Sequence, residues 1–399
     1  MIDTNRQFCV KKEGWLLNRK HVLFYSILRP LVILFTKLRF GYTYEKVENL
    51  PKNYIVMSNH ATDYDMLLVA ASFPKQMYFV ASEHVTRMGL LSKLVKYAFD
   101  PIIRPKGASA AATVMEMVRK ARKGDNVCLF AEGVRTWDGV TCEIVPSTGR
   151  LVKTAGCGLV TYKITGGYFS SPMWSGASVR KGYLHGAPVK VYTPEQLQQM
   201  TAAEVQQAIE TDLYEDAYAR QLEKPMRYKS KAPAKGLENL LYICPKCGAY
   251  DCFSAQGDTV SCKDCGFTFR YNEYGMLENA PFDTLYAFSR WQKEQLAADV
   301  REGSVYSASN GVLSCLENHE ETFIAEGTVQ MSAETLRCGE WEMPMRKITD
   351  LAMHGQRAIV FTADKRYYEL IPAKGSNALK FFLYYNLVKA EQNSKRTVR

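Results

Sequence analysis

Apolar and polar positions along residues 54–165 predict short strands that alternate with amphipathic helices. Helices are expected to begin near Met66 and to cover residues 85–99 and 108–123, with more helix at 190–225. The apolar runs expected to form strands lie at residues 54–57, 77–80, 126–130 and 159–165. Alternation of this kind predicts an α/β fold in which helices flank a mostly parallel sheet.

An apolar stretch at residues 22–36 precedes this pattern. It is shorter than the roughly 20 residues that span a bilayer, and Arg29 and Pro30 interrupt it. The basic residues that flank it are Arg19, Lys20, Lys37 and Arg39. We therefore expect residues 1–50 to form helices that lie in a membrane interface, with basic side chains at the lipid headgroups. The alternative is a helix pair packed on the protein's own core.

The pattern changes in the last third of the chain. Residues 224–240 are basic and contain proline, as expected of a linker. A helix is expected at 283–300, and a closing helix at 377–390. The short strands expected between them lie at residues 321–325, 328–331, 357–362 and 366–371. This succession resembles a small PH-like or GRAM-like barrel, so residues 280–399 are expected to form a β-rich, PH-like domain.

Composition narrows the class of partner and compartment. A chain of 399 residues has room for two or three domains. The net charge of +10 suits anionic partners: phosphate-bearing substrates, anionic lipid or nucleic acid. The N-terminal residues do not have the layout of a signal peptide, and 11 cysteines then favour a reducing compartment over a disulfide scaffold. We expect the cytoplasm, in a bacterium.

The first candidate for chemistry is the turn that follows the strand at 54–57. His60 lies there, where α/β sheets place their ligands. Asp65, five positions later, can reach back to one imidazole nitrogen, fix the tautomer and leave the other nitrogen as a base. Alternatively, Thr62 and Asp65 form a capping box that only stabilises the following helix, and His60 is an ordinary turn histidine.

Two later blocks follow strands in the same way. One is the segment at 102–107, which contains Arg104 and Lys106; the other reads F-A-E-G-V-R-T at 130–136. In order and spacing, the three blocks resemble the glycerolipid acyltransferase family, specifically 1-acylglycerol-3-phosphate acyltransferases. That family carries N-H-x-x-x-x-D, then an Arg-bearing block, then F-P-E-G-T-R-S.

The agreement covers roughly residues 20–220. The first block is complete, whereas Ala131 and Val134 replace a proline and a threonine in the third. The family's fourth block is not clear here, and residues 159–165 occupy roughly its place. These departures leave the reaction type intact and the acceptor open.

The resemblance implies that residues 51–223 form an O-acyltransferase domain. It would move a fatty acyl group from acyl-CoA or acyl carrier protein to the free hydroxyl of 1-acylglycerol-3-phosphate, giving phosphatidic acid. His60 and Asp65 would be the general-base pair, and catalysis would need no cofactor. Glycerol-3-phosphate or another lysolipid is the alternative acceptor. The enzyme would be bound peripherally to an anionic surface of the cytoplasmic membrane.

Roles for the remaining block residues follow from their charge. A guanidinium grips phosphate in a bidentate way, so Arg135 is the first choice for the acceptor phosphate, with Arg104 and Lys106 assisting. A surface ion pair is the alternative for Arg104. Glu132 is expected to orient Arg135 or to accept from the acceptor hydroxyl. Two further residues are expected to support the site through the backbone or the oxyanion: Asn59 and Gly133.

A second motif lies at residues 241–272. Two C-x-x-C pairs are separated by fourteen residues and comprise Cys244, Cys247, Cys262 and Cys265. Four thiolates complete a tetrahedral shell without an open position, so a zinc ribbon with structural Zn²⁺ is expected. Cys252 falls outside the spacing. A pair of redox dithiols is the alternative.

The competing function class is a binding protein on a relic acyltransferase fold, in which the ribbon grips nucleic acid or protein. The ribbon segment contains two basic residues, Lys246 and Lys263, and three acidic ones: Asp251, Asp258 and Asp264. That balance argues against nucleic acid. The joint presence of the candidate site residues favours the enzyme.

Overall fold

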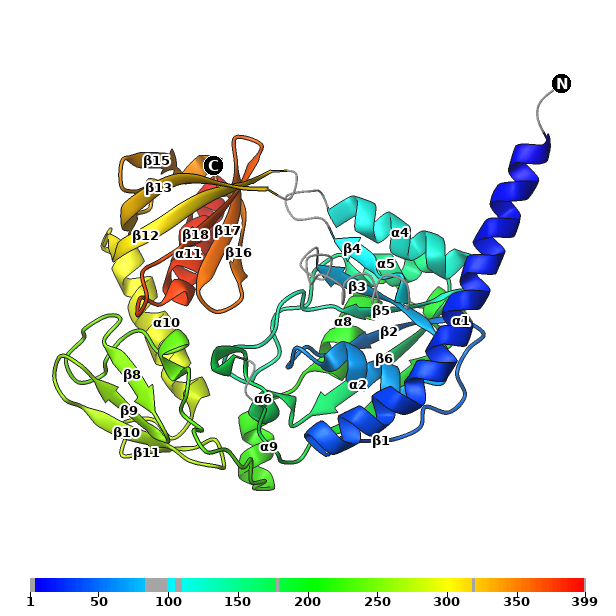
Figure 1. Cartoon of the computed structure of the whole chain (residues 1–399), viewed down its shortest axis with the longest axis horizontal. Helices are drawn as coiled ribbons and strands as arrows, with labels where there is room; N and C mark the ends of the chain where they lie inside the picture. The colour runs from blue at the N-terminus through cyan, green and yellow to red at the C-terminus, as the bar shows by residue number, and fades with distance from the viewer. Residues whose placement is uncertain (1–3, 83–98, 105–109, 177–178, 318–319, 398–399) are drawn as a thin grey trace. The chain divides into compact units, whose positions relative to one another are not determined.

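The structure is a computed structural model that describes residues 4–82, 99–104, 110–176, 179–317 and 320–397 (Figure 1). The chain divides into two compact units. The first comprises Met1–Ser171 and Val179–Arg220, and the second comprises Pro172–Ser178 and Gln221–Arg399. Each unit has its own core and is described by itself. The helix expected at 85–99 lies almost entirely outside the described residues.

The first unit contains a seven-stranded sheet of order β1-β7-β6-β2-β5-β3-β4. Every neighbouring pair is parallel except β6 and β7. The strands are β1 (Thr43–Tyr44), β2 (Tyr54–Ser58), β3 (Met77–Ser82), β4 (Ile102–Arg104), β5 (Asn126–Phe130), β6 (Gly158–Thr165) and β7 (His185–Tyr192). The predicted α/β fold with a mostly parallel sheet is confirmed.

Helices cover both faces of this sheet. The helices that pack with the sheet include α2 (Asp65–Ser72), α4 (Ala110–Arg122), α5 (Thr148–Ala155), α7 (Pro194–Gln199) and α8 (Ala202–Leu213). The short helix α6 (Gly167–Ser170) follows β6, and α9 (Ala217–Glu223) follows α8. Successive strand residues point to opposite faces. Ile55 and Met57 pack in a core with α4, α5 and α8, whereas Tyr54 and Val56 pack in a core with α2 and the N-terminal helix. Burial on both faces explains why these strands are apolar throughout.

The N-terminal segment is one helix, α1 (Thr4–Phe40), with Pro30 inside it. The expected interruption at Arg29 and Pro30 was therefore wrong. Two hydrogen bonds to α2 hold the helix near the proline. Tyr25 Oη donates to Ala70 O (2.8 Å), and Arg29 Nη2 donates to Ala71 O (2.9 Å). Both acceptors lie in the last turn of α2, where carbonyls have no partner within the helix.

The continuous helix also changes the length of the apolar segment. His21–Phe40, twenty residues, is long and apolar enough to cross a membrane by length and composition alone. The core helix of a soluble protein can meet the same criteria. In this helix, however, only 11% of the apolar window is buried.

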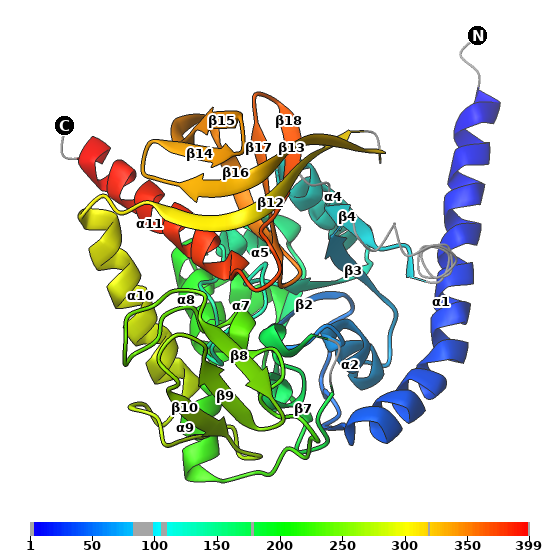
Figure 2. The same ribbon diagram turned by 60° about the vertical axis from the view of Figure 1, so that its left-hand side comes forward.

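The second unit begins with a four-stranded antiparallel sheet of β8 (Phe253–Gln256), β9 (Thr259–Cys262), β10 (Thr268–Tyr271) and β11 (Leu277–Glu278). Helix α10 (Leu285–Arg301) follows. It lies beside the C-terminal helix α11 (Ala378–Thr397), as Figure 2 shows. The expected helices near 283–300 and 377–390 correspond to these two elements.

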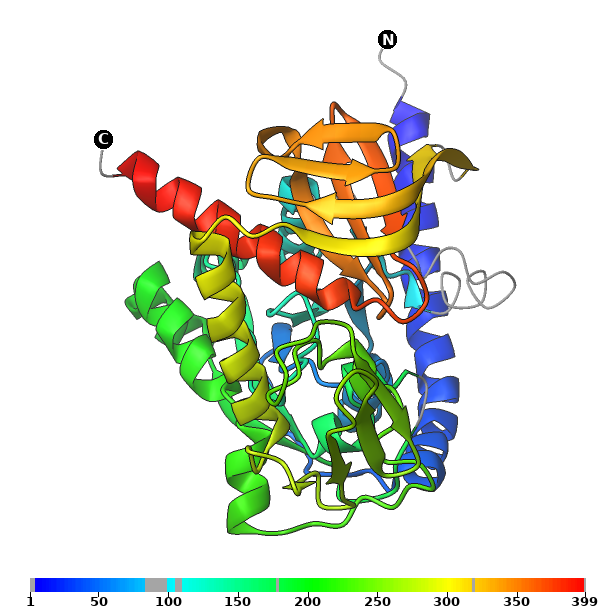
Figure 3. The ribbon, with the colours of Figure 1, turned by 90° about the vertical axis from the view of Figure 1, so that its left-hand side faces the viewer.

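The rest of this unit is a seven-stranded antiparallel sheet of order β15-β14-β13-β12-β18-β17-β16. Its strands are β12 (Tyr306–Glu317), β13 (Glu320–Met331), β14 (Thr335–Cys338), β15 (Trp341–Pro344), β16 (Thr349–His354), β17 (Ala358–Ala363) and β18 (Arg366–Ile371). Helix α11 crosses one face of the sheet (Figure 3). Its side chains Phe381, Tyr384 and Val388 belong to the same buried core as the strands. The expected β-rich C-terminal region is confirmed, although the two strands expected at 321–331 form the single strand β13.

The connection between β6 and β7 links the two units in an unexpected way. After α6, the chain leaves the first unit at Pro172 and returns at Val179. The short turn η2 (Met173–Ser175) in between belongs to the core of the second unit, where Trp174 is fully buried. The sequence pattern did not indicate this insertion, because a short loop with one tryptophan has no periodicity.

Candidate active site

The candidate site lies in the loop at the carboxyl end of β2. Asn59, the first residue of this loop, is buried and bridges to the end of β6. Its Oδ1 accepts from Ile164 N (2.8 Å) and its Nδ2 donates to Ile164 O (2.9 Å). The amide therefore holds the turn to the neighbouring strand, and both of its polar groups are engaged by the backbone.

His60 follows with its ring three-quarters buried. Its Nδ1 lies 2.8 Å from Asp65 Oδ2, and the ring stacks on Phe130 with centroids 4.6 Å apart. Among the described residues, Nε2 has no hydrogen-bond partner. The carboxylate and the phenyl ring thus fix the plane of the imidazole and leave one nitrogen available as a base, the arrangement that general-base catalysis needs.

Asp65 is fully buried and is held by the same loop. Its Oδ2 also accepts from Ala61 N (2.7 Å) and Thr62 N (3.0 Å), and Oδ1 accepts from Thr62 Oγ1 (2.6 Å). The helix starts at Asp65 with Tyr64 as N-cap, so the alternative of a complete capping box is not formed. Four donors, one of them the imidazole, determine where this carboxylate lies.

Glu132 links the loop to the block that follows β5. Its Oε1 accepts from His60 N (2.6 Å) and its Oε2 accepts from Cys142 N (2.7 Å). The side chain is 5% exposed, and burial raises the pKa of Glu132 to about 7 although both hydrogen bonds oppose the shift. Both carboxylate oxygens thus accept from backbone amides, and neither pairs with Arg135, which was one of the two roles expected for Glu132.

Arg135 lies next to the same loop. Gly133 has a φ of 69° and donates its N–H to Phe130 O (3.0 Å), which turns the chain after β5. Arg135 Nη2 pairs with Asp63 Oδ1 (2.9 Å), and the side chain is only 12% exposed. Its Nη1 is buried without a hydrogen-bond partner in the part of the chain that the structure describes. Burial lowers the pKa of Arg135, an effect that an anionic ligand would offset.

Of the two other basic candidates, the structure describes Arg104 alone. Arg104 ends β4 and is exposed, and a Cβ on Gly133 would lie 4.0 Å from its Nη1. It therefore lies beside the turn that carries Arg135. Lys106 lies outside the described residues.

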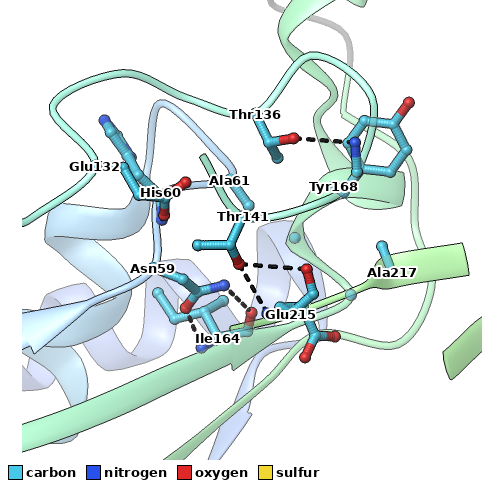
Figure 4. A pocket seen from close by; sticks show the side chains of 13 residues that line it. Asn59, His60, Ala61, Glu132, Thr136, Thr141, Ile164, Tyr168, Glu215 and Ala217 are labelled. Carbon is cyan, nitrogen blue, oxygen red and sulfur yellow. Dashed lines mark hydrogen bonds between the residues drawn. The ribbon is translucent and has the colours of Figure 1, made fainter. Parts of the chain in front are cut away.

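A pocket opens beside His60 and contains several residues that the sequence did not single out (Figure 4). His60 and Glu132 lie on one side of it and Tyr168 on another. The lining residues are Asn59, His60, Ala61, Glu132, Thr136, Gly139, Thr141, Ile164, Gly166, Gly167, Tyr168, Glu215 and Ala217. The adjacent glycines at 166 and 167, directly after an apolar strand, were a usable sequence indication of this wall.

The four predicted cysteines come together in the second unit. The sulfur atoms of Cys244, Cys247, Cys262 and Cys265 all lie within 4.8 Å of one another. Each pair forms the same turn, in which the glycine after the second cysteine donates to the first cysteine's carbonyl. Gly248 and Gly266 have φ of 74° and 70° there, which favours glycine. Such a cluster could hold a metal ion. Cys252 stays outside it.

Comparison with known proteins gives three results. Residues 41–165 match the family model described as acyltransferase. Among solved structures, the chain is similar to the 1-acyl-sn-glycerophosphate (LPA) acyltransferase PlsC from Thermotoga maritima. The identity is 19%, the TM-score is 0.42, and the alignment covers 52% of this chain and 83% of that one. The search of curated proteins found no match.

The matched residues 41–165 contain the His60–Asp65 pair, Glu132 and Arg135, the residues on which the resemblance was based. The family match therefore confirms the expected enzyme class. Residues 41–165 match the acyltransferase family model, and this match supports an O-acyltransferase activity for the domain that contains them.

Proposed function

We propose that the protein transfers a fatty acyl group from an acyl thioester to the free hydroxyl of 1-acylglycerol-3-phosphate, giving phosphatidic acid. The observation that carries this proposal is the His60–Asp65 pair beside a pocket, in which Nδ1 of the imidazole is bound and Nε2 has no partner among the described residues. The donor is acyl-CoA or acyl carrier protein, whose thioesters have the same reactive group.

The reaction needs one base and no covalent enzyme intermediate. His60 Nε2 takes the proton of the acceptor hydroxyl while that oxygen attacks the thioester carbonyl. The new C–O bond forms and the C–S bond breaks. The departing thiolate then recovers the proton from the imidazolium. Asp65, which accepts from Nδ1, stabilises the imidazolium between these two steps.

The acceptor phosphate is assigned to Arg135. Its buried Nη1 lacks a partner among the described residues, while Nη2 is shared with the half-exposed Asp63. A phosphate oxygen at Nη1 would satisfy the donor and offset the cost of burying the guanidinium. Arg104, beside the same turn, and Lys106 would add to the positive potential.

The four-cysteine cluster is proposed to hold zinc. Four thiolates at one point suit Zn²⁺, and they leave no position open for substrate. The ion would therefore serve the fold of the second unit, and the acyl transfer itself would not involve it. Symmetric turns at both pairs support this assignment over a redox function.

Helix α1 is proposed to attach the enzyme peripherally to the cytoplasmic membrane. Among residues 21–40, whose side chains the structure describes, the apolar side chains exposed by more than half are Leu23, Ile27, Leu31, Leu34 and Leu38. Their spacing places them along one side of the helix, opposite Tyr25 and Arg29, which bind α2. A double Leu31→Glu and Leu34→Glu variant should lose binding to anionic vesicles in co-sedimentation. Leu222→Glu, equally exposed on α9, should bind as the wild type does.

The test of the activity is transfer of a labelled acyl group from acyl-CoA to lysophosphatidic acid, wild type beside His60→Ala. Labelled phosphatidic acid should form only with the wild type. Product with a different acceptor or with an acyl carrier protein donor alone would correct the substrate. Equal turnover by both proteins would remove His60 as the base.

A further inference from the structure

The wall of the pocket opposite the base is a short segment whose far end is anchored elsewhere. Gly166, Gly167 and Tyr168 line the pocket beside His60. A Cβ on Gly167 would lie only 2.9 Å from Ala61 Cβ and 3.2 Å from Thr62 Cγ2. The segment α6 therefore packs directly on the loop that carries His60, so a shift of α6 would displace that loop.

Four residues after Tyr168, the chain enters the second unit. There Trp174 is fully buried and packs edge to face on Tyr271, with ring centroids 5.5 Å apart. Tyr271 ends β10, whose neighbour β9 ends at the cluster residue Cys262. The metal-binding sheet thus forms part of the seat of Trp174.

Hydrogen bonds from two other parts of the second unit fix the same turn. Asn239 Nδ2 donates to Trp174 O (3.0 Å), and Gln356 Nε2 donates to Met173 O. A Cβ on Gly236 would lie 2.3 Å from Trp174 O, so the backbone approaches very closely there. A fully buried tryptophan with its neighbouring carbonyls bound is an anchor and not a solvent-facing loop tip.

The chain then returns to the first unit and closes onto α6. Arg180 N donates to Ser170 O (2.8 Å), and Ser171 N donates to Gly167 O (3.0 Å). Both ends of the inserted turn are therefore bonded to α6, whose residues Gly167 and Tyr168 line the pocket. Releasing the turn would free backbone that starts four residues after Tyr168, a residue of the pocket wall. Segments become more mobile where such anchors are removed.

We propose that Trp174 is a positioning residue for acyl transfer: its burial in the second unit fixes α6, and α6 fixes the pocket wall beside His60. Trp174 touches neither substrate nor base, and it acts through Gly167 and Tyr168. This inference rests on the proposed function for its catalytic consequence, but its structural part does not. It gives the metal-binding unit a task in an enzyme whose chemistry needs no metal.

The test compares Trp174→Ala with Trp341→Ala in the full-length, metal-loaded protein. Trp341 packs on Phe361 and Tyr368 within the second unit and is not part of the anchor. Hydrogen exchange of peptides that cover residues 166–171 should rise in Trp174→Ala and stay at the wild-type level in Trp341→Ala. Turnover should fall by up to about 100-fold in Trp174→Ala alone, the scale of a 1 Å misplacement, and Trp174→Phe should restore most of it.

If Trp174→Ala does not fold, Asn239→Ala and Gln356→Ala each remove one hydrogen bond to the turn and should give the same exchange pattern with a smaller amplitude. Unchanged exchange at 166–171 while residues 172–176 open would overturn the proposal. An equal rise in Trp341→Ala would overturn it too. If the wild type transfers no acyl group to any acceptor, the proposed function fails while the exchange data still decide this inference.

Discussion

The His60 loop and the four-cysteine cluster are both read from short spacings in the sequence, but they end in opposite states. The cluster directs all four sulfur atoms at one point and leaves no ligand position open. The loop saturates Asp65 with four donors yet leaves His60 Nε2 without a partner among the described residues. If the proposed roles are right, the structural site has all its ligand atoms engaged with one another, whereas the catalytic site keeps one reactive atom accessible to substrate.

The largest expected effect tests the closed site. Cys262→Ser removes one of the four proposed metal ligands, and because metal binding contributes to the free energy of folding, the free energy of unfolding of the second unit should fall by several kcal/mol. Cys252→Ser is the matched control, since Cys252 is also a buried ribbon cysteine but lies outside the cluster. The melting temperature and the bound metal are measured for both variants and for the wild type. Equal melting temperatures and metal content for Cys262→Ser and the wild type would mean that the cluster is not a metal site.

A substitution in the His60 loop should lower activity and leave stability nearly unchanged. His60→Ala should lower kcat by about 10²–10⁴-fold, the usual contribution of a general base. The melting temperature should hardly change, because the side chain is partly exposed and Asp65 keeps three other donors. Steady-state kinetics measure the change in kcat, and thermal unfolding of the same preparation measures the melting temperature. A large loss of stability would place His60 with the cysteines as a structural residue.

A smaller effect is expected at the phosphate end of the open site. Arg135→Ala should raise the KM for the acceptor by about 10–100-fold, the scale of charged hydrogen bonds, with a smaller change in kcat. Arg135→Lys should recover only part of the affinity, because an ammonium cannot reproduce the planar fork. Acceptor titrations at saturating donor measure this. An unchanged KM in Arg135→Ala would remove the assignment.

A fourth prediction concerns the pH dependence of stability and rests on Glu132, which links the two loops of the candidate site. Its pKa is about 7 in the folded protein against an ordinary value of 4.5, so the folded state binds more protons between those pH values. Its contribution to stability is therefore present at pH 4.5 and below and is lost as the pH rises through 7.

The free energy of unfolding of the wild type, relative to Glu132→Gln, should fall by up to about 3 kcal/mol between pH 5 and pH 8. Urea unfolding at a series of pH values measures the difference. Parallel profiles for the two proteins would show that the carboxyl group is not protonated in this range.

Local spacing alone determined part of this protein. His60 and Asp65 lie five positions apart in the loop that leads into α2, and the two cysteines of each C-x-x-C pair lie in one turn, so short-range geometry fixes their contacts. The alternation of strands and helices likewise fixed the parallel sheet, because apolar runs of strand length with helices between them have few other ways to be buried. These features follow from residues that are close in the chain.

Other features depend on contacts between residues that are far apart in the chain. Glu132 binds the amide of His60 across 72 positions, and Asn59 binds Ile164 across 105, so neither role could be derived from its own neighbours. Pro30 remains inside α1 because Tyr25 and Arg29 bind α2, a contact that outweighs the local preference for a break. Trp174 is buried in the second unit for the same reason: burial is settled by the core that a side chain meets, and sequence periodicity does not report it.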